Sequence, residues 1–290
     1  MAQPVIGLIG GSGLYQIDGL ADAAWHAVDT PWGAPSDDLL VGHLDGVKLI
    51  FLPRHGRGHV HTPSTVPYRA NIAALKMMGA TDVISVSACG SFREEMAPGD
   101  FVLVDQFIDR TFARDKTFFG TGLVAHVSVA HPTCARLSAI CQKAATQAGA
   151  KVHVGGTYLA MEGPQFSTLA ESKLYRDVWG CDVIGMTNMP EAKLAREAEL
   201  CYQPVAMITD YDSWHPDHGS VQITEIIETL HGNSAKAARM VAALPGQMPD
   251  TRGPCPEGCD RALDHAIMTA PDARDPDMVA RLSVIAGRVL

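Results

Sequence analysis

The chain has 290 residues, of which 47% are hydrophobic, and carries a formal net charge of −9. This length and hydrophobicity are typical of a globular protein with a sizeable core and exclude a disordered or fibrous chain. The acidic balance argues against nucleic acid and an anionic membrane surface as partners, because both favour a basic face. No apolar run is long enough to span a membrane and no basic signal-peptide region opens the chain, so we expect a cytoplasmic protein.

Short apolar, β-branched runs alternate with helical patterns along the chain. The predicted strands are residues 5–9, 47–52, 83–86, 101–104, 158–161, 183–184 and 205–208, and the predicted helices are residues 66–78, 135–148, 168–178, 191–199 and 223–243. Thr168 and Glu171 have the spacing of a capping box, which would begin the third helix. Strands that alternate with helices indicate an α/β fold around a largely buried sheet.

The first 245 residues contain no internal repeat and no low-complexity linker, so residues 1–245 are interpreted as one domain. The composition changes at residues 245–260, which are rich in proline and glycine, before a final helix predicted at residues 261–269. So short a segment cannot bury a core of its own. We therefore interpret residues 246–290 as an extension that packs on the same domain or on a neighbouring subunit.

The seven cysteines form no zinc-ribbon pattern, and most stand singly in apolar segments, where buried thiols are common. We therefore predict no metal and no cofactor. Only Cys255-Pro-Glu-Gly-Cys259 contains a close pair. A disulfide remains open for this pair, although free thiols are favoured in a mesophile.

Two carboxylates, Asp210 and Asp212, directly follow the apolar run 205–208. If the strand continues, residues two apart point to the same side, so both acids would address one ligand from the carboxyl end of a sheet. Burial and a like charge both raise the pKa of such a carboxyl, which suits a general acid. Capping of the next helix and exposure to water are the alternatives.

A glycine-rich turn follows the first predicted strand in Gly10-Gly11-Ser12-Gly13. Its backbone N–H groups and the Ser12 hydroxyl would suit an anion. The turn lacks the glycine spacing of a dinucleotide site and the Gly-Lys-Ser/Thr ending of a P-loop. A plain strand–turn–helix junction therefore remains open.

Further polar side chains follow other predicted strands: Arg54 and His55, then Ser87, then Thr187. An arginine fork matches a tetrahedral oxyanion, and hydroxyl groups complete its hydrogen bonds. Together with Ser12 these residues would form a cup for inorganic phosphate. A metal site is not expected at His55, His59 and His61, because that loop offers no acidic or cysteine ligand.

Eight ordered motifs over roughly residues 5–245 resemble the S-methyl-5′-thioadenosine phosphorylases, a branch of the trimeric purine nucleoside phosphorylases. They are Gly10-Gly11-Ser12-Gly13-Leu14, Asp29-Thr30-Pro31-Trp32-Gly33-Ala34-Pro35-Ser36, Arg54-His55-Gly56, Ala88-Cys89-Gly90-Ser91, Asp105-Gln106-Phe107-Ile108-Asp109-Arg110-Thr111, Met161-Glu162-Gly163-Pro164-Gln165-Phe166, Met186-Thr187-Asn188-Met189-Pro190-Glu191 and Thr209-Asp210-Tyr211-Asp212. The resemblance implies a single α/β domain whose central mixed sheet is partly closed into a barrel and surrounded by helices. It also implies a homotrimer, or a dimer of such trimers, with active sites near the subunit contacts.

The resemblance implies a pentosyl transfer in which phosphate, a co-substrate, attacks methylthioadenosine and releases adenine and 5-methylthioribose 1-phosphate, a step of purine and methionine salvage. By matching motif, Asp210 would donate to purine N7, and Asp212 would hold the exocyclic amine, so the chain would select adenine over a 6-oxopurine. The remaining implied roles are phosphate binding by Ser12, Arg54, His55, Ser87, Ala88 and Thr187, and nucleoside binding by Phe166, Met186 and Tyr211.

An apolar pocket should select the 5′-methylthio group over a hydroxyl, because polar groups left unpaired there are costly. The candidates for this specificity are Ser167, Ile223, Ile285 and His126 from a neighbouring subunit, although Ile223 and Ile285 could equally be helix core. Gln165 and Asn188-Met189 depart from better-known relatives and leave substrate breadth open. A broader purine nucleoside phosphorylase, a hydrolytic nucleosidase and a nucleotide-binding regulatory module are the alternatives.

Overall fold

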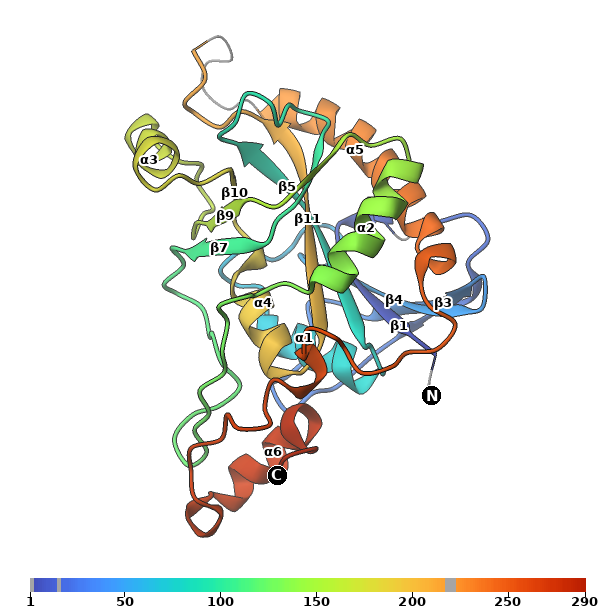
Figure 1. Cartoon of the computed structure of the whole chain (residues 1–290), viewed down its shortest axis with the longest axis vertical. Helices are drawn as coiled ribbons and strands as arrows, with labels where there is room; N and C mark the ends of the chain where they lie inside the picture. Colours follow the sequence, from blue (N-terminus) through green and yellow to red (C-terminus); the bar gives the residue numbers. More distant parts are fainter. Residues whose placement is uncertain (1–2, 15–16, 217–222) are drawn as a thin grey trace.

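The computed structural model describes residues 3–14, 17–216 and 223–290 (Figure 1). A large mixed sheet is flanked by helices, as the alternation of patterns predicted. The strands are β1 (Val5–Gly10), β2 (Ala21–His26), β3 (Leu39–Leu44), β4 (Val47–Pro53), β5 (Asp82–Ser91), β6 (Phe101–Leu103), β7 (Gln106–Asp109), β8 (Val152–Val154), β9 (Thr157–Ala160), β10 (Val183–Gly185) and β11 (Cys201–Asp210). The helices are α1 (Tyr68–Met77), α2 (Ala135–Gln147), α3 (Leu169–Lys173), α4 (Asn188–Glu197), α5 (Ile223–Ala243) and α6 (Pro276–Ala286).

The sheet branches at β5, which pairs with β1, β10 and β11. One path runs β2-β3-β4-β1-β5-β10-β9-β7, and β11 pairs with the other edge of β5 and continues to β6 and β8. β4, β1, β5 and β11 are mutually parallel along this order, whereas β10 meets the far end of β5 in antiparallel register, Ile184 opposite Gly90. The expected α/β fold with a mixed sheet is confirmed, and among the described strands the sheet branches rather than closing into a complete ring.

Both faces of the sheet are covered by helices, which explains why the strands are continuous apolar runs rather than alternating ones. Neighbouring residues of β1 enter different cores: Ile9 packs with α1 and α4, and Leu8 packs with α2 and α5. The carboxyl ends of the four parallel strands are therefore left at one edge of a sheet that is buried on both faces. Among the described residues, no helix combines the length and apolarity needed to span a membrane.

The predicted helices agree with the structure to within a few residues at their ends, and the third continues past α3 as a wider π turn, Leu174–Val178. The capping box is confirmed, because the Thr168 hydroxyl accepts from the Glu171 N–H and the Glu171 side chain accepts from the Thr168 N–H.

The helix predicted at residues 261–269 is wrong. A short 3-10 turn and isolated turns occupy this segment, because Ile267 forms a β-bridge with Ala125 and the Met268 N–H donates to the Val124 carbonyl. Pairing with a distant loop thus replaces the local helical hydrogen bonds. The last helix is α6, which begins after the Asp275 side chain caps the Met278 N–H.

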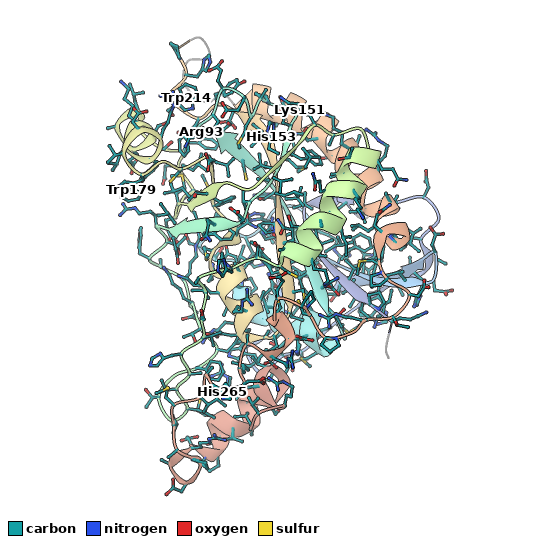
Figure 2. The ribbon with its side chains drawn as sticks, viewed as in Figure 1. Arg93, Lys151, His153, Trp179, Trp214 and His265 are labelled. Atoms are coloured by element: carbon teal, nitrogen blue, oxygen red, sulfur yellow. The ribbon has the colours of Figure 1, made fainter. Side chains whose placement is uncertain are left out.

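The C-terminal segment, residues 246–290, packs against the rest of the same chain. Leu282 and Ile285 of α6 join the core that contains α1, whereas Cys255 and Cys259 join the core that contains α2 and α5. His265, labelled in Figure 2, lies with α6 at the end of the molecule opposite Trp214, which follows β11. The segment is therefore anchored far from the carboxyl end of β11.

Candidate active site

A cavity of about 560 Å³ lies where the carboxyl ends of β1, β4, β5 and β11 meet. Open α/β sheets bind ligands at this edge. The predicted residues that line it are Arg54, His55, Ser87, Ala88, Phe166, Met186, Thr187, Asp210 and Asp212. Nine positions that are scattered along the sequence are thus brought to one cavity, whose size is ordinary for a small-molecule site.

Arg54 follows β4 and is only 3% exposed. Its Nε donates to Glu191 at 2.6 Å, Nη1 donates to the Val86 carbonyl at 3.1 Å, and Nη2 donates to Ser85 and more weakly to Glu191. Burial alone would lower the pKa of Arg54, but the Glu191 carboxylate outweighs it and holds the pKa above its ordinary value. Four of the five guanidinium N–H groups are thereby used, so the arginine is a fixed positive charge with one N–H left for a ligand.

His55 is held as a neutral ring at neutral pH. Burial, reinforced by the Arg54 charge, lowers the pKa of His55 to about 4. Because its Nδ1 lies 2.8 Å from the His61 carbonyl, which only accepts, Nδ1 carries the proton and Nε2 keeps a lone pair. The His55 and His59 rings stack with their centroids 4.3 Å apart. Parallel stacking does not converge two ring nitrogens on one ion, and the absence of a metal in this loop stays a prediction.

Ser87 of β5 and Thr187, the residue before α4, add hydroxyl groups to the same cavity. Ser87 donates to the Asn188 carboxamide oxygen at 3.1 Å, and the Asn188 amide donates to Ser85 and Tyr202. Thr187 makes no side-chain capping bond to the helix that it precedes. Arg54, His55, Ser87 and Thr187 therefore form a polar group of one charge, one ring nitrogen and two hydroxyls, suited to an anion.

Asp210 ends β11, and its two oxygens accept from Thr209 Oγ1 and from the Asp212 N–H, both at 2.8 Å. Burial and the charge of Asp212 raise the pKa of Asp210 above its ordinary value, against the effect of these two hydrogen bonds. Gly90 permits this arrangement, because a Cβ at that position would lie 2.9 Å from Asp210 Oδ1. Asp210 is thus a carboxyl that is positioned at the cavity and biased toward its protonated form.

Asp212 reaches the cavity by a different route from the one that strand alternation predicts. The strand ends at Asp210, the pairing with β5 shifts between Ile208 and Asp210, and Asp212 sits in a turn with φ of 50°. Its carboxylate accepts from the Ser167 hydroxyl at 2.6 Å. Both acids line the cavity, but the turn and Ser167, rather than a continuing strand, orient the second one.

Apolar side chains cover the remaining wall. Phe166 is 46% exposed and lines the cavity together with Met186, Met161 and Leu230. Leu230 and Ser234 lie one turn apart on α5, and Ser234 packs closely against Gly13 in the turn after β1. Helix α5 therefore borders the cavity, at positions further along the helix than Ile223.

Several predicted residues are not brought to the cavity wall of this chain. Tyr211 turns away and donates to the Glu94 carbonyl, and His126 is exposed, so its expected role in a neighbouring site stays a prediction. Ile285 is 2% exposed within the core, which supports its alternative as helix core. Ser167 acts one layer back, through Asp212. The side chains of Ser12 and Ile223 lie outside the described residues.

The sequence interpretation missed the residues that hold the predicted ones in place. Glu191 is 1% exposed and neutralises Arg54, and Asn188 is fully buried behind Ser87. Both lie in the motif 186–191, directly after Thr187, but no signal in the sequence indicated that they would meet Arg54 and Ser87. Met189 is 3% exposed and Gln165 is exposed, and neither lines the cavity.

Residues 5–244 match the family model of the phosphorylase superfamily. A curated S-methyl-5′-thioadenosine phosphorylase of Cereibacter sphaeroides is 70% identical, with 99% of this chain and 98% of the relative aligned. A crystal structure of a methylthioadenosine phosphorylase from an antarctic soil metagenomic library superposes with a TM-score of 0.92 at 43% identity, covering 98% of this chain and 99% of the other. A Schistosoma mansoni methylthioadenosine phosphorylase in complex with adenine gives a TM-score of 0.79 at 35% identity, covering 85% and 93%. The chain therefore belongs to the phosphorylase superfamily and, within it, to the S-methyl-5′-thioadenosine phosphorylases.

Proposed function

We propose that the chain cleaves S-methyl-5′-thioadenosine with inorganic phosphate, giving adenine and 5-methylthioribose 1-phosphate. The observation that carries this is one cavity that holds both an anion-binding group, Arg54 with Ser87 and Thr187, and a carboxyl with a raised pKa, Asp210. The first group suits the nucleophile and the second suits the leaving base. The high identity to phosphorylases named for this substrate supports the same choice.

Phosphate would bind beside Arg54, which has one N–H left for it, and would accept from the hydroxyl of Thr187 and from that of Ser87, whose proton would turn from the Asn188 oxygen to the anion. The lone pair on His55 Nε2 is suited to accept a hydrogen bond from the P–OH group of a monohydrogen phosphate, since Nδ1 is already engaged with the His61 carbonyl. The anion would then lie below the anomeric carbon. There its charge stabilises the positive charge that develops on the sugar as the glycosidic bond breaks.

The leaving base would be protonated or hydrogen-bonded at N7 by Asp210. A carboxyl is able to donate at neutral pH only when its pKa is raised, and burial together with Asp212 raises the pKa of Asp210. The second oxygen of Asp210 and the carboxylate of Asp212, which is held by Ser167, would both accept from the 6-amino group of adenine. The 6-oxo group of hypoxanthine would instead face an acceptor, which explains a preference for adenine.

The 5′-methylthio group would rest on the apolar part of the wall. Leu230 and Leu14 line the cavity next to the turn after β1. Met207 of β11 and Met161, which directly follows β9, line it as well. A 5′-hydroxyl placed against such side chains would lose its hydrogen bonds, at a cost of about 1–3 kcal/mol. This supports discrimination of methylthioadenosine from adenosine by roughly tenfold to a hundredfold.

A hydrolytic nucleosidase is the nearest alternative and is less well supported. Water needs a carboxylate base on the nucleophile side of the sugar. The acid nearest to Arg54 is Glu191, which is 1% exposed and bound to that arginine, so it cannot take a proton from a cavity water. The discriminating experiment measures adenine release from methylthioadenosine with and without phosphate. We expect release only with phosphate, and equal rates in a phosphate-free buffer would refute the proposal.

We also propose a homotrimer in which His126 of one subunit completes the site of the next. Exposed apolar side chains at the end of β7 and around α3 support a contact there: Phe112 is 81% exposed and Val178 is 73% exposed. The two segments touch, since Arg110 lies over the Trp179 ring at 5.6 Å. Analytical ultracentrifugation should give a trimer or a dimer of trimers, and a monomer at micromolar concentration would refute the assembly.

We place the reaction in cytoplasmic purine and methionine salvage. All seven cysteines are buried free thiols in the structure, which suits a reducing compartment. Growth on methylthioadenosine as a purine source, with and without the gene, would test this role, and unimpaired growth of the deletion strain would contradict it.

A further inference from the structure

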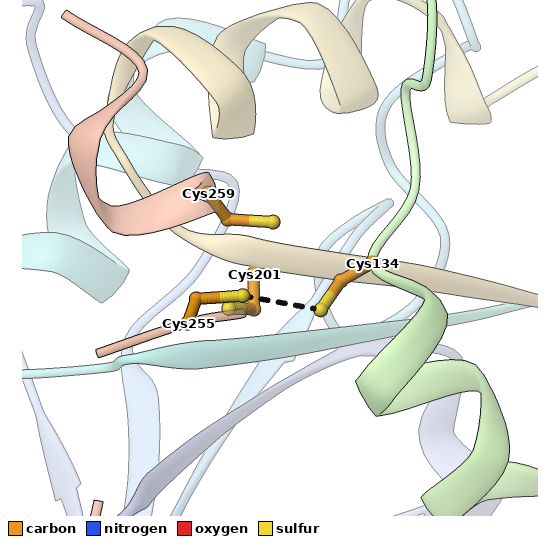
Figure 3. A group of neighbouring side chains, drawn as sticks. All are labelled: Cys134, Cys201, Cys255 and Cys259. Carbon is orange, nitrogen blue, oxygen red and sulfur yellow. Dashed lines mark hydrogen bonds between the residues drawn. The ribbon is translucent and has the colours of Figure 1, made fainter. Parts of the chain in front are cut away.

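Four cysteines that are far apart in the sequence meet in one buried cluster. Cys134 precedes α2, Cys201 begins β11, and Cys255 and Cys259 belong to the C-terminal segment (Figure 3). Their sulfur atoms all lie within 4.8 Å of one another, and none of the four residues is more than 3% exposed. Among the described residues, no other group of three or more cysteine, histidine or acidic side chains converges in this way.

We propose that this cysteine cluster binds one zinc ion. Tetrahedral coordination with zinc–sulfur bonds of about 2.3 Å places neighbouring sulfurs roughly 3.8 Å apart. The Cys134 and Cys255 sulfurs are separated by 3.7 Å, and all four cysteines of the cluster are free thiols. Four thiolates in a closed tetrahedral set are the donors of structural zinc sites, and softness of the sulfur disfavours magnesium, calcium and manganese.

Charged groups and a helix N-terminus lie beside the cysteine cluster. Arg252 donates to the Cys201 sulfur at 3.1 Å, and Asp82, which is fully buried, pairs with both Arg252 and Arg136. Cys134 occupies the N-cap position of the 13-residue helix α2, where the helix dipole stabilises a negative sulfur. Arg252 also pairs with Asp260 at 3.6 Å, so two acids balance the two arginines. The helix N-terminus and the hydrogen bond from Arg252 to Cys201 are the groups that would support the thiolates of a zinc centre.

The local chain geometry is that of a metal-binding turn. Gly258 has φ of 67° and its N–H donates to the Cys255 carbonyl at 2.9 Å, which folds Cys255-Pro-Glu-Gly-Cys259 back on itself. Asp260 accepts from the Cys255 N–H at 3.0 Å and closes the turn. Three residues between two cysteines fall within the ligand spacing of zinc sites. The other two ligands come from distant elements, so the sequence alone showed only half of the set.

The zinc ion would stabilise the folded structure and take no part in the reaction. All four positions are occupied by protein ligands and are buried, which leaves no open site for a water or substrate. The metal would join the C-terminal segment to the first residue of β11 and to the start of α2. Asp210 lies at the other end of the same strand, about 30 Å away at 3.3 Å per residue. The expected contribution is therefore attachment of residues 246–290.

The test is elemental analysis of the full-length protein, purified under reducing conditions without chelator. We expect about one zinc ion per chain. The double variant Cys255→Ala/Cys259→Ala should lose the metal and melt at a lower temperature. The control Cys141→Ala/Cys181→Ala also removes two buried thiols, but both lie outside the cluster, so it should keep the zinc.

If the cluster variant does not fold, the wild-type protein still decides the question. Titration of its thiols with a mercurial should release zinc to a colorimetric chelator, and replacement by Co²⁺ should give the visible spectrum of tetrahedral thiolate ligation. Wild-type protein that contains no metal and binds no Co²⁺ would overturn the proposal. Disulfides among these cysteines in unreduced mass spectra would also overturn it, as would iron in place of zinc.

Discussion

Replacement of Asp210 by asparagine removes the proton that the carboxyl can transfer and leaves the shape of the side chain unchanged. Asp210→Asn keeps the size of the side chain, and its oxygen can still accept from the Asp212 N–H. The new amide would donate to Thr209 Oγ1, whose own proton can turn to the Cys89 carbonyl, already 3.2 Å away. Both local hydrogen bonds therefore survive, so we expect a folded protein with an unchanged melting temperature.

The expected loss follows from what asparagine cannot do. Burial and the charge of Asp212 raise the pKa of Asp210, which favours a proton on the carboxyl for N7 to receive, whereas an amide does not transfer one. General acid catalysis contributes about 10²–10⁴-fold, equivalent to about 3–5 kcal/mol of transition-state stabilisation. We expect kcat/KM for methylthioadenosine to fall by at least about a hundredfold, with little change in the KM for phosphate, because Asp210 does not belong to the anion group.

The assay compares methylthioadenosine with methylthioinosine in saturating phosphate. The 6-oxo base accepts a hydrogen bond where adenine donates, so an asparagine amide removes a repulsion that Asp210 imposes. The ratio of the two kcat/KM values should therefore shift toward methylthioinosine in Asp210→Asn. An equal loss for both substrates would refute the role of Asp210 in recognising the 6-substituent. An unchanged rate for methylthioadenosine would refute its role as a general acid.

Two further variants test other contacts. Burial raises the pKa of Glu197 from 4.5 to about 7, so the folded state binds more protons than the unfolded state in that window and the free energy of unfolding falls as pH rises through it. Between pH 4.5 and 8 the free energy of unfolding of the wild type should fall by about 3 kcal/mol more than that of Glu197→Gln. Denaturant unfolding at each pH measures this difference, and the same pH dependence in both proteins would contradict it. Gly90→Ala places a Cβ 2.9 Å from Asp210 Oδ1 and should lower kcat/KM about tenfold. Gly246→Ala, which has open space, should not; equal losses would refute the close-approach argument.

The elements that the sequence predicted correctly are those with a strong local signal. The helix at residues 135–148 and the strand runs that became β1, β4 and β11 have clear periodicity or continuous apolar character. The failure at residues 261–269 has a physical cause, since the bridge between Ile267 and Ala125 joins parts of the chain more than a hundred residues apart. Local propensity carries no information about such a partner. The strands β2, β3, β7 and β8 were missed: β2 is exposed, β7 and β8 are short, and the apolar run of β3 is interrupted by Gly42 and His43.

The sequence predicted which residues line the cavity, but not the hydrogen bonds that hold them in place. Strand ends that carry Arg54, Ser87 and Asp210 are visible in the sequence, because each follows an apolar run. The pairing of Arg54 with Glu191 is not visible, since α4 reaches the arginine only in the folded sheet. Its consequence is large: four of the five guanidinium N–H groups of Arg54 are occupied and its charge is paired with Glu191, so the arginine offers a ligand one N–H group and not an open fork.

The two central strands connect the cavity with the cysteine cluster. β5 runs from Asp82, which pairs with Arg136 and Arg252, to Gly90, which admits Asp210. The adjacent β11 runs in parallel from Cys201 to Asp210 itself. Yet the orientation of Asp210 is set locally, by Thr209, the Asp212 N–H and the space at Gly90, and none of these contacts involves the opposite strand end. Loss of the metal from the cysteine cluster should therefore lower the free energy of unfolding but leave the preference for adenine over hypoxanthine unchanged. The hydrogen bonds that recognise the base are made at the carboxyl end of β11 and do not depend on contacts at its other end.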